Sequence, residues 1–202
     1  MVGKVARADA VVWLDDVRFT MPGFVNRNQL PDGTWLVVPV ERRDHRTPIR
    51  EVTIAPDGGQ WRCDHVWTLR NRYLAEDHYD PLIAEVLSGE LAAAGARLVD
   101  LNLELTEIII GDLGLSTREF RQSDLGVAAT GSLSSRIARM VKAIGGTAYL
   151  APSTARLDRD VFHREALELL TFDYAGPNPS VIDPLFRTGQ LPTTPRQEVT
   201  TA

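Results

Sequence analysis

The chain has 202 residues, of which 44% are hydrophobic and 24% are charged. This length corresponds to about one domain, and a chain of this size buries roughly 70% of its surface on folding. The composition therefore excludes collagen-like, disulfide-scaffold and wholly disordered proteins. With 22 basic and 27 acidic residues, the net charge of -5 also lacks the basic balance that is typical of nucleic-acid-binding proteins.

Cysteine usage and apolar patterning indicate a cytoplasmic protein. The single cysteine, Cys63, cannot form an internal disulfide, which is typical of a reducing compartment. No apolar run approaches the ~20 residues that cross a bilayer, and residues 1–9 lack the apolar stretch of a signal peptide. We therefore expect neither a nucleic acid nor a membrane as a partner.

Hydrophobic periodicity predicts alternating strands and helices. In chain order, the predicted elements are strands over 10–14, 35–40 and 52–54, helices over 66–73, 82–89, 98–109 and 132–144, a strand over 147–150, a helix over 161–167, a strand over 169–172 and a helix over 178–186. This order predicts an α/β fold, a single-domain sandwich with a mostly parallel central sheet flanked by helices, over residues 1–190. Residues 191–202 are rich in Thr, Pro and Gln and predict a disordered tail.

Serine and glycine mark the ends of two predicted helices. Gly114 is expected at the C′ position that follows one helix. Residues 132–135 offer serine N-caps to the next helix, and Gly145 with Gly146 is expected to stop it.

Asp15 and Asp16 follow the first predicted strand. Ligands of open α/β sheets gather beyond the carboxyl ends of the strands, and adjacent strand residues point to opposite faces. At most one of the two carboxylates can therefore face a given pocket, where it could bind an amine or hydroxyl, hold a metal or act as a base. The alternative is a polar strand end that caps the following turn.

Residues 24–28 form a predicted loop with many hydrogen-bond donors, in which Arg27 lies between Asn26 and Asn28. The planar guanidinium suits a phosphate or a carboxylate. The alternative is a surface loop whose asparagine side chains bond to their own backbone.

His65 lies near the start of a predicted helix, where an imidazole could move a proton near neutral pH. The four histidines and Cys63 lack metal-ligand spacing, so we predict no metal site and expect Cys63 to be a buried small side chain. No nucleotide-binding glycine loop or hydrolase motif is present, and no cofactor is identified.

Two later segments carry further candidates. Arg136 lies in the first turn of a helix that follows the serine-rich loop, where free N–H groups, hydroxyls and a guanidinium would suit a diphosphate or carboxylate. The alternative is a solvated basic face. Ser180 and Asp183 are spaced as in a helix start, with Ser180 as the N-cap, which explains them without a function.

Taken in order, several segments resemble the WbqC-like protein family, and together they cover the chain up to Gln190. They are WLDDVRF (13–19), FVNRN (24–28), WLVVPV (35–40), Trp61 with His65, Arg136 with Gly145 and residues 149–150, and SVIDPLF (180–186) with Gly189.

The chain also departs from the family pattern. Members usually begin with a strand and loop that precede the segment matching residues 4–9, whereas Met1 starts inside the helix that should follow. We expect a truncated chain, a late start codon or a lost element. Ala-Pro-Ser-Thr at 151–154 replaces a glycine-containing motif, Pro184 replaces an apolar residue, and a tyrosine and a glutamine are absent around 174–179.

The resemblance implies a bacterial transferase of surface-polysaccharide (O-antigen) or specialised-metabolite biosynthesis, which moves an acyl or aminoacyl group onto an amine. The expected partner is a small molecule, either a sugar nucleotide or an acyl or aminoacyl donor. We predict His65 as the general base, Asp15 or Asp16 as the group that orients the acceptor, and six binding residues: Asn26, Arg27, Asn28, Arg136, Ser180 and Asp183.

Two alternatives remain open. One is nucleotidylyl transfer, with Mg²⁺ held by Asp15 or Asp16. The other is a non-catalytic family member that acts as a binding module. The oligomeric state is also open. The transferase hypothesis requires the predicted side chains to meet at one cleft beside the sheet.

Overall fold

The computed structural model describes residues 2–41, 44, 46–56, 59–87, 96–128, 130–173 and 180–190. Its helices are α1 (Val2–Val5), α2 (Gln60–Tyr73), α3 (Pro81–Leu87), α4 (Leu98–Asp112), α5 (Leu133–Ala143), α6 (Arg159–Arg164) and α7 (Ile182–Thr188). Its strands are β1 (Ala10–Trp13), β2 (Arg27–Gln29), β3 (Trp35–Val37), β4 (Arg118–Arg121), β5 (Ala148–Pro152) and β6 (Glu168–Phe172), and two short 3-10 helices are η1 (Ile49–Glu51) and η2 (Gln122–Leu125).

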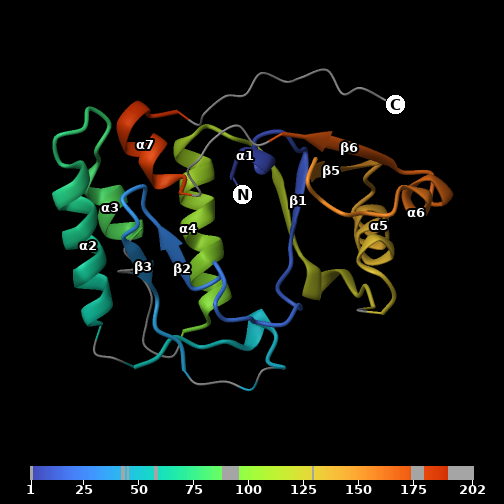
Figure 1. Ribbon diagram of the computed structural model, residues 1–202, viewed down its shortest axis with the longest axis horizontal. Coiled ribbons are helices and arrows are strands. Elements are labelled where there is room, and N and C mark those ends of the chain that lie inside the picture. Colours follow the sequence, from blue (N-terminus) through green and yellow to red (C-terminus); the bar gives the residue numbers. More distant parts are fainter. Residues whose placement is uncertain are drawn as a thin grey trace.

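The described strands form three two-stranded sheets. β1 pairs with β4 and β5 pairs with β6, both in parallel, while β2 and β3 form an antiparallel hairpin. Helices flank these sheets (Figure 1), so the predicted α/β class with mostly parallel pairing is confirmed. The parallel strands are divided between two ladders and do not form one continuous sheet within the described residues.

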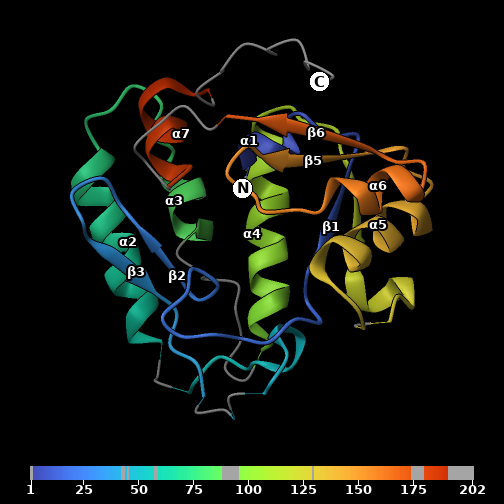
Figure 2. The same ribbon diagram turned by 45° about the vertical axis from the view of Figure 1, so that its right-hand side comes forward.

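The ladders lie in two halves of the molecule, which Figures 1 and 2 show from two directions. The hairpin half contains β2, β3, α2, α3, α4 and α7. The strand half contains β1, β4, β5, β6, α5 and α6. Each half has its own apolar core. Leu69, Tyr73, Ile109 and Phe186 belong to the core of the hairpin half, whereas Ile137, Val141 and Phe162 belong to that of the strand half.

Local signals define the ends of α4 and α5 as the sequence predicted. After α4, Gly114 has a φ of 62° and the Leu115 N–H donates to the Ile110 carbonyl at 3.0 Å. Before α5, the Ser132 side chain accepts from the Ser135 N–H at 3.2 Å. After α5, Gly145 has a φ of 73°. Such positive φ angles strain any residue with a Cβ, which explains glycine at both helix ends.

Several other expectations were wrong. β2 lies where a loop was predicted, and β4 was not predicted at all. Residues 52–54 contribute only isolated bridges, from Thr53 and Ile54. Cys63 is exposed. The N-cap of α7 is Val181 and not Ser180.

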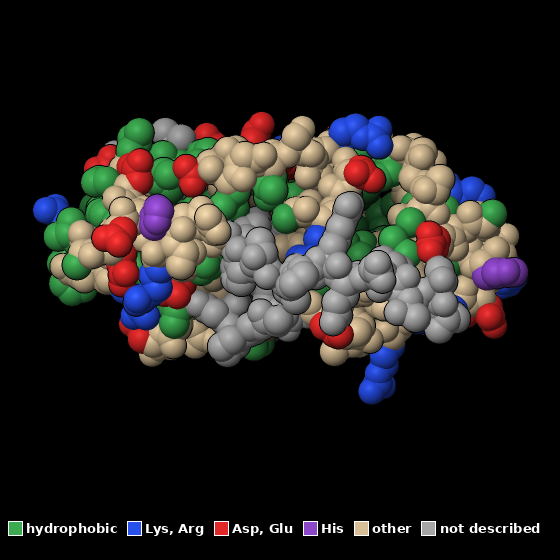
Figure 3. Space-filling view, turned by 90° about the horizontal axis from the view of Figure 1, so that it is seen from above, with side chains coloured by type: hydrophobic (Ala, Val, Ile, Leu, Met, Phe, Trp, Pro, Cys, Tyr) green, Lys and Arg blue, Asp and Glu red, His purple; other side chains and the backbone are tan. Residues whose placement is uncertain are grey.

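Some predictions fall outside the described residues. These are the tail over 191–202, the helix end near Gly89, and the helix start at residues 178–179. Among the helices that are described, none combines the length and apolar character that a bilayer span requires. On the face seen from above, acidic and basic side chains of the described residues are interspersed (Figure 3).

Candidate functional site

The β2–β3 hairpin carries or adjoins three predicted site residues. Asn26 precedes β2, is 4% exposed and donates from Nδ2 to the Val38 carbonyl at 3.0 Å. Arg27 and Asn28 lie on β2. The predicted asparagine-rich loop is therefore partly a strand, whose backbone pairs with β3.

Alternation along the hairpin separates these side chains onto two faces. Asn28 pairs with Leu36, which is buried at 5% exposure, so this pair lies on the inner face. Arg27 pairs with Val37 and Gln29 with Trp35. Because Trp35 and Val37 are exposed, the second face of the hairpin points outward, and Arg27 lies on it.

His65 lies on α2 and packs against the hairpin. Trp61, His65, Leu69 and Tyr73 are buried at intervals of four residues, which places them on one face of the helix. The His65 ring meets the Trp61 ring edge-on, with 5.2 Å between the ring centres. Burial lowers the pKa of His65 to about 4, although a hydrogen bond with the Val37 backbone opposes the shift. The imidazole is therefore neutral near pH 7.

Contacts with α7 bring in Ser180 and Asp183. Asn28 Nδ2 donates to Ser180 Oγ at 3.0 Å, and the same hydroxyl accepts from the Ile182 N–H at 3.3 Å. The Tyr73 hydroxyl donates to Asp183 at 3.0 Å. Burial raises the pKa of Tyr73 to about 12, so this hydroxyl keeps its proton. Asn26, Arg27, Asn28, His65, Ser180 and Asp183 therefore all belong to the hairpin half.

Asp15 and Asp16 follow the end of β1 in the strand half and contact different partners. Asp15 is 2% exposed and accepts from Ser123 twice, from the N–H at 2.9 Å and from Oγ at 2.6 Å. Asp16 forms an ion pair with Arg50 at 2.7 Å, and its side chain is 31% exposed. Asp15 therefore holds η2, which contains Ser123, against the end of β1, whereas the alternative interpretation had it cap the turn that follows β1 in the sequence.

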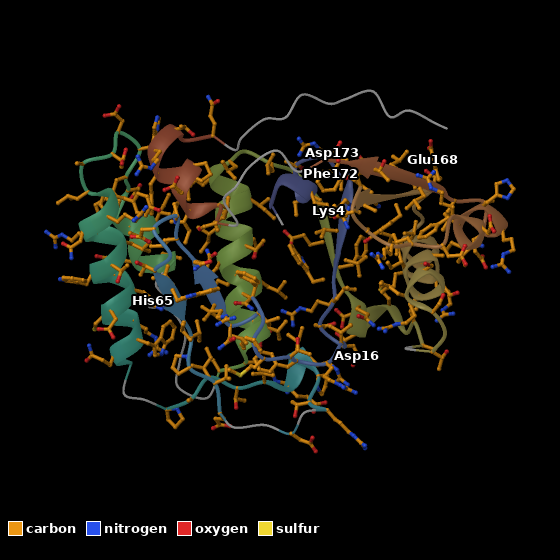
Figure 4. The ribbon with its side chains drawn as sticks, viewed as in Figure 1. Lys4, Asp16, His65, Glu168, Phe172 and Asp173 are labelled. Carbon is orange, nitrogen blue, oxygen red and sulfur yellow. The ribbon has the colours of Figure 1, made fainter. Side chains whose placement is uncertain are left out.

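Arg136 also belongs to the strand half. Its Nε is buried and has no hydrogen-bond partner among the described residues. The neighbouring serine hydroxyls have partners within the protein, because Ser132 caps α5 and Ser134 Oγ accepts from the Asp158 N–H at 2.9 Å. The labelled residues of Figure 4 show the separation between the halves: His65 lies on α2, whereas Asp16 lies beyond the end of β1 on the far side of α4.

These contacts join six of the predicted residues through the hairpin and α7, while Asp15, Asp16 and Arg136 lie in the other half. The structure therefore does not bring all nine predicted residues together at one cleft. Sequence reasoning missed Tyr73 and Ser123. The sequence places Tyr73 only at the end of the helix predicted over 66–73, although a buried tyrosine hydroxyl usually has a polar partner. No sequence pattern near Ser123 predicts its hydrogen bond, because its partner Asp15 is 108 residues away.

Within the described part of the chain, no group of three or more His, Cys, Asp or Glu side chains is arranged to hold a metal ion. The fold and these contacts define a small α/β protein in which motif residues from both ends of the chain meet on one hairpin. The model of the WbqC-like protein family matches residues 2–190, and the chain belongs to this family. Comparisons with curated proteins and with solved structures find no match.

Proposed function

We propose that this protein transfers an acyl or aminoacyl group onto the amine of a small molecule, in the assembly of a bacterial surface polysaccharide or a specialised metabolite. Membership of the WbqC-like family supports this class of reaction through the resemblance described above. The single observation that carries the proposal is the place of His65, which lies on the buried face of α2 and bonds to the backbone of the hairpin that presents Arg27.

Acyl transfer to an amine requires a group that removes a proton. The amine nitrogen attacks the acyl carbon, the bond from that carbon to the leaving oxygen or sulfur breaks, and the ammonium proton passes to a base and then to the leaving group. A pKa of about 4 keeps His65 unprotonated at neutral pH, and it also makes the imidazole a weaker base than an exposed histidine. Its imidazole, 7% exposed, would accept the proton where it meets solvent.

The other residues of the hairpin half would bind or position. Arg27 would hold an anionic group of the substrate, as its planar fork suits phosphate or carboxylate. Asn28, Ser180 and Asp183 would position the hairpin and α7, since their hydrogen bonds join these elements to each other and to α2. Asp15 and Asp16 would hold the end of β1 in place. Arg136 would take no part in proton transfer.

The test is transfer measured by mass spectrometry, with acyl and aminoacyl thioesters as donors and amino-sugar nucleotides as acceptors. A His65→Ala variant should lose most of its turnover while its circular dichroism spectrum is unchanged. The exposed His163, on α6, provides the matched control, and His163→Ala should keep full turnover. A folded His65→Ala protein with full turnover would contradict the base assignment.

A second candidate function is a non-catalytic binding module. It is favoured because several of the predicted site residues already form hydrogen bonds or ion pairs within the protein. Asp15 is engaged by Ser123, Asp16 by Arg50 and Asn28 by Ser180. Such a module would gain thermal stability from a ligand, because binding to the folded state alone raises stability. A ligand that raises Tm but is never converted, with any donor, would favour this candidate over the transferase.

A further inference from the structure

The outward face of the β2–β3 hairpin exposes two aromatic rings. Phe24 is 62% exposed and Trp35 is 37% exposed. Their ring centres are 5.6 Å apart and their planes are tilted by 41°. Val37, 41% exposed, extends the apolar surface along β3. Three neighbouring apolar side chains therefore remain in solvent on one short hairpin.

Arg27 adds a positive charge to this surface. Its guanidinium carbon lies 4.1 Å from the centre of the Trp35 ring, and its Nε donates to the Gly23 carbonyl at 2.8 Å. These two contacts fix the plane of the guanidinium. None of the ion pairs among the described residues involves Arg27, and its terminal nitrogens donate to no described acceptor.

We infer that Phe24, Trp35 and Arg27 form a binding platform for a nucleoside diphosphate. A nucleobase stacks favourably on an exposed aromatic ring, and such surface is offered by Phe24 and by the part of Trp35 that Arg27 leaves uncovered. A guanidinium fork binds phosphate oxygens through two parallel hydrogen bonds, and no carboxylate of the described residues pairs with Arg27. A planar ring linked to a strong anion matches both features at once, whereas a purely apolar or purely anionic ligand matches only one.

The inference rests on the proposed function, because the nucleoside diphosphate would be the carrier of the sugar whose amine accepts the acyl group. The platform and His65 are connected through β3: Trp35 and Val37 both lie on this strand, and the Val37 backbone bonds to the imidazole. A nucleotide held on the outward face would thus be positioned by the strand that also contacts the proposed base.

Isothermal titration calorimetry with three probes tests the inference on the full chain. UDP carries both ring and diphosphate, uridine carries the ring alone, and inorganic pyrophosphate carries the anion alone. We expect UDP to bind more tightly than either fragment. Trp35→Ala should weaken UDP binding about tenfold or more, from the loss of one stacked base. Arg27→Gln should weaken UDP and pyrophosphate but leave uridine unchanged.

The matched control is Trp67, an exposed tryptophan on α2 that is 70% exposed. Trp67→Ala should bind UDP as the unchanged protein does. Trp35→Phe keeps a ring and should retain most UDP affinity, and an unchanged circular dichroism spectrum of Trp35→Ala excludes misfolding as the cause of its weaker binding.

Two outcomes would overturn the inference: equal UDP affinity of Trp35→Ala and the unchanged protein, or tighter binding of a single-stranded oligonucleotide than of UDP. UDP binding without any transfer would support the platform and count against the transferase. Transfer to an amine without UDP binding would support the transferase and count against the platform.

Discussion

Asn28 and Ser180 are 152 residues apart in the sequence, yet Asn28 Nδ2 donates to Ser180 Oγ at 3.0 Å. Ser180 is 3% exposed, and Asn28 lies on the inner face of the hairpin beside the buried Leu36. The bond therefore joins β2 to the start of α7 at a place that is largely shielded from water. Buried polar groups of this kind are costly to leave without a partner.

The first prediction concerns the strength of this contact. Ser180→Ala and Asn28→Ala should each lower the free energy of unfolding by about 1–2 kcal/mol, since each removes a hydrogen bond from a largely buried place. The stability lost by the double variant should be about 1 kcal/mol smaller than the sum of the losses of the two single variants. Urea denaturation of the four proteins measures this coupling. Fully additive losses would mean that the two side chains do not interact.

The second prediction concerns stability against pH. The pKa of His65 falls from 6.5 to about 4 on folding, so between these values the unfolded chain binds more protons than the folded protein. Stability should therefore rise as pH increases from about 4 to 6.5 and should be lost as pH falls through this window. The pKa difference corresponds to about 3 kcal/mol. His65→Gln should show a smaller rise over the same window, whereas an unchanged slope would contradict the buried neutral imidazole.

The third prediction compares two adjacent carboxylates. Asp15→Ala removes both acceptors of Ser123 from a buried position and should cost about 3 kcal/mol of stability. Asp16→Ala breaks only a partly exposed ion pair with Arg50 and should cost less than about 1 kcal/mol. Thermal or chemical denaturation of both variants tests the difference. Equal losses would show that burial does not separate their roles.

The fourth prediction uses two glycines with open space around them. No atom lies within 4 Å of a Cβ built on Gly111 or on Gly145. Gly111 lies within α4, so Gly111→Ala should stabilise the protein by about 0.5–1 kcal/mol. Gly145 has a φ of 73°, so Gly145→Ala should destabilise it by about 1–2 kcal/mol. Differential scanning calorimetry should give Tm changes of opposite sign; changes of the same sign would contradict the assigned helix ends.

Some of the fold could be predicted because its causes are local. The apolar stripe of α4, the serine cap of α5 and the glycines after both helices depend on residues within a few positions of one another.

Other elements could not be predicted, because their partners are distant. β4 reads Arg-Glu-Phe-Arg, which has no apolar run, and it becomes a strand by pairing with β1 from more than a hundred positions away. β2 resembles a polar loop in sequence and is ordered by β3, α2 and α7 together. Short strands carry weak local preferences, and tertiary pairing decides whether they form.

The sequence alone determined the α/β class, most helices, the two glycine-marked helix ends and the WbqC-like family. Only the tertiary structure decided that Asn28 donates a hydrogen bond to Ser180, that Asp15 accepts one from Ser123, and that His65 and Asp16 lie in different halves. The physical reason is that periodicity and capping act over a few residues, whereas these contacts depend on how buried surfaces far apart in the chain pack together.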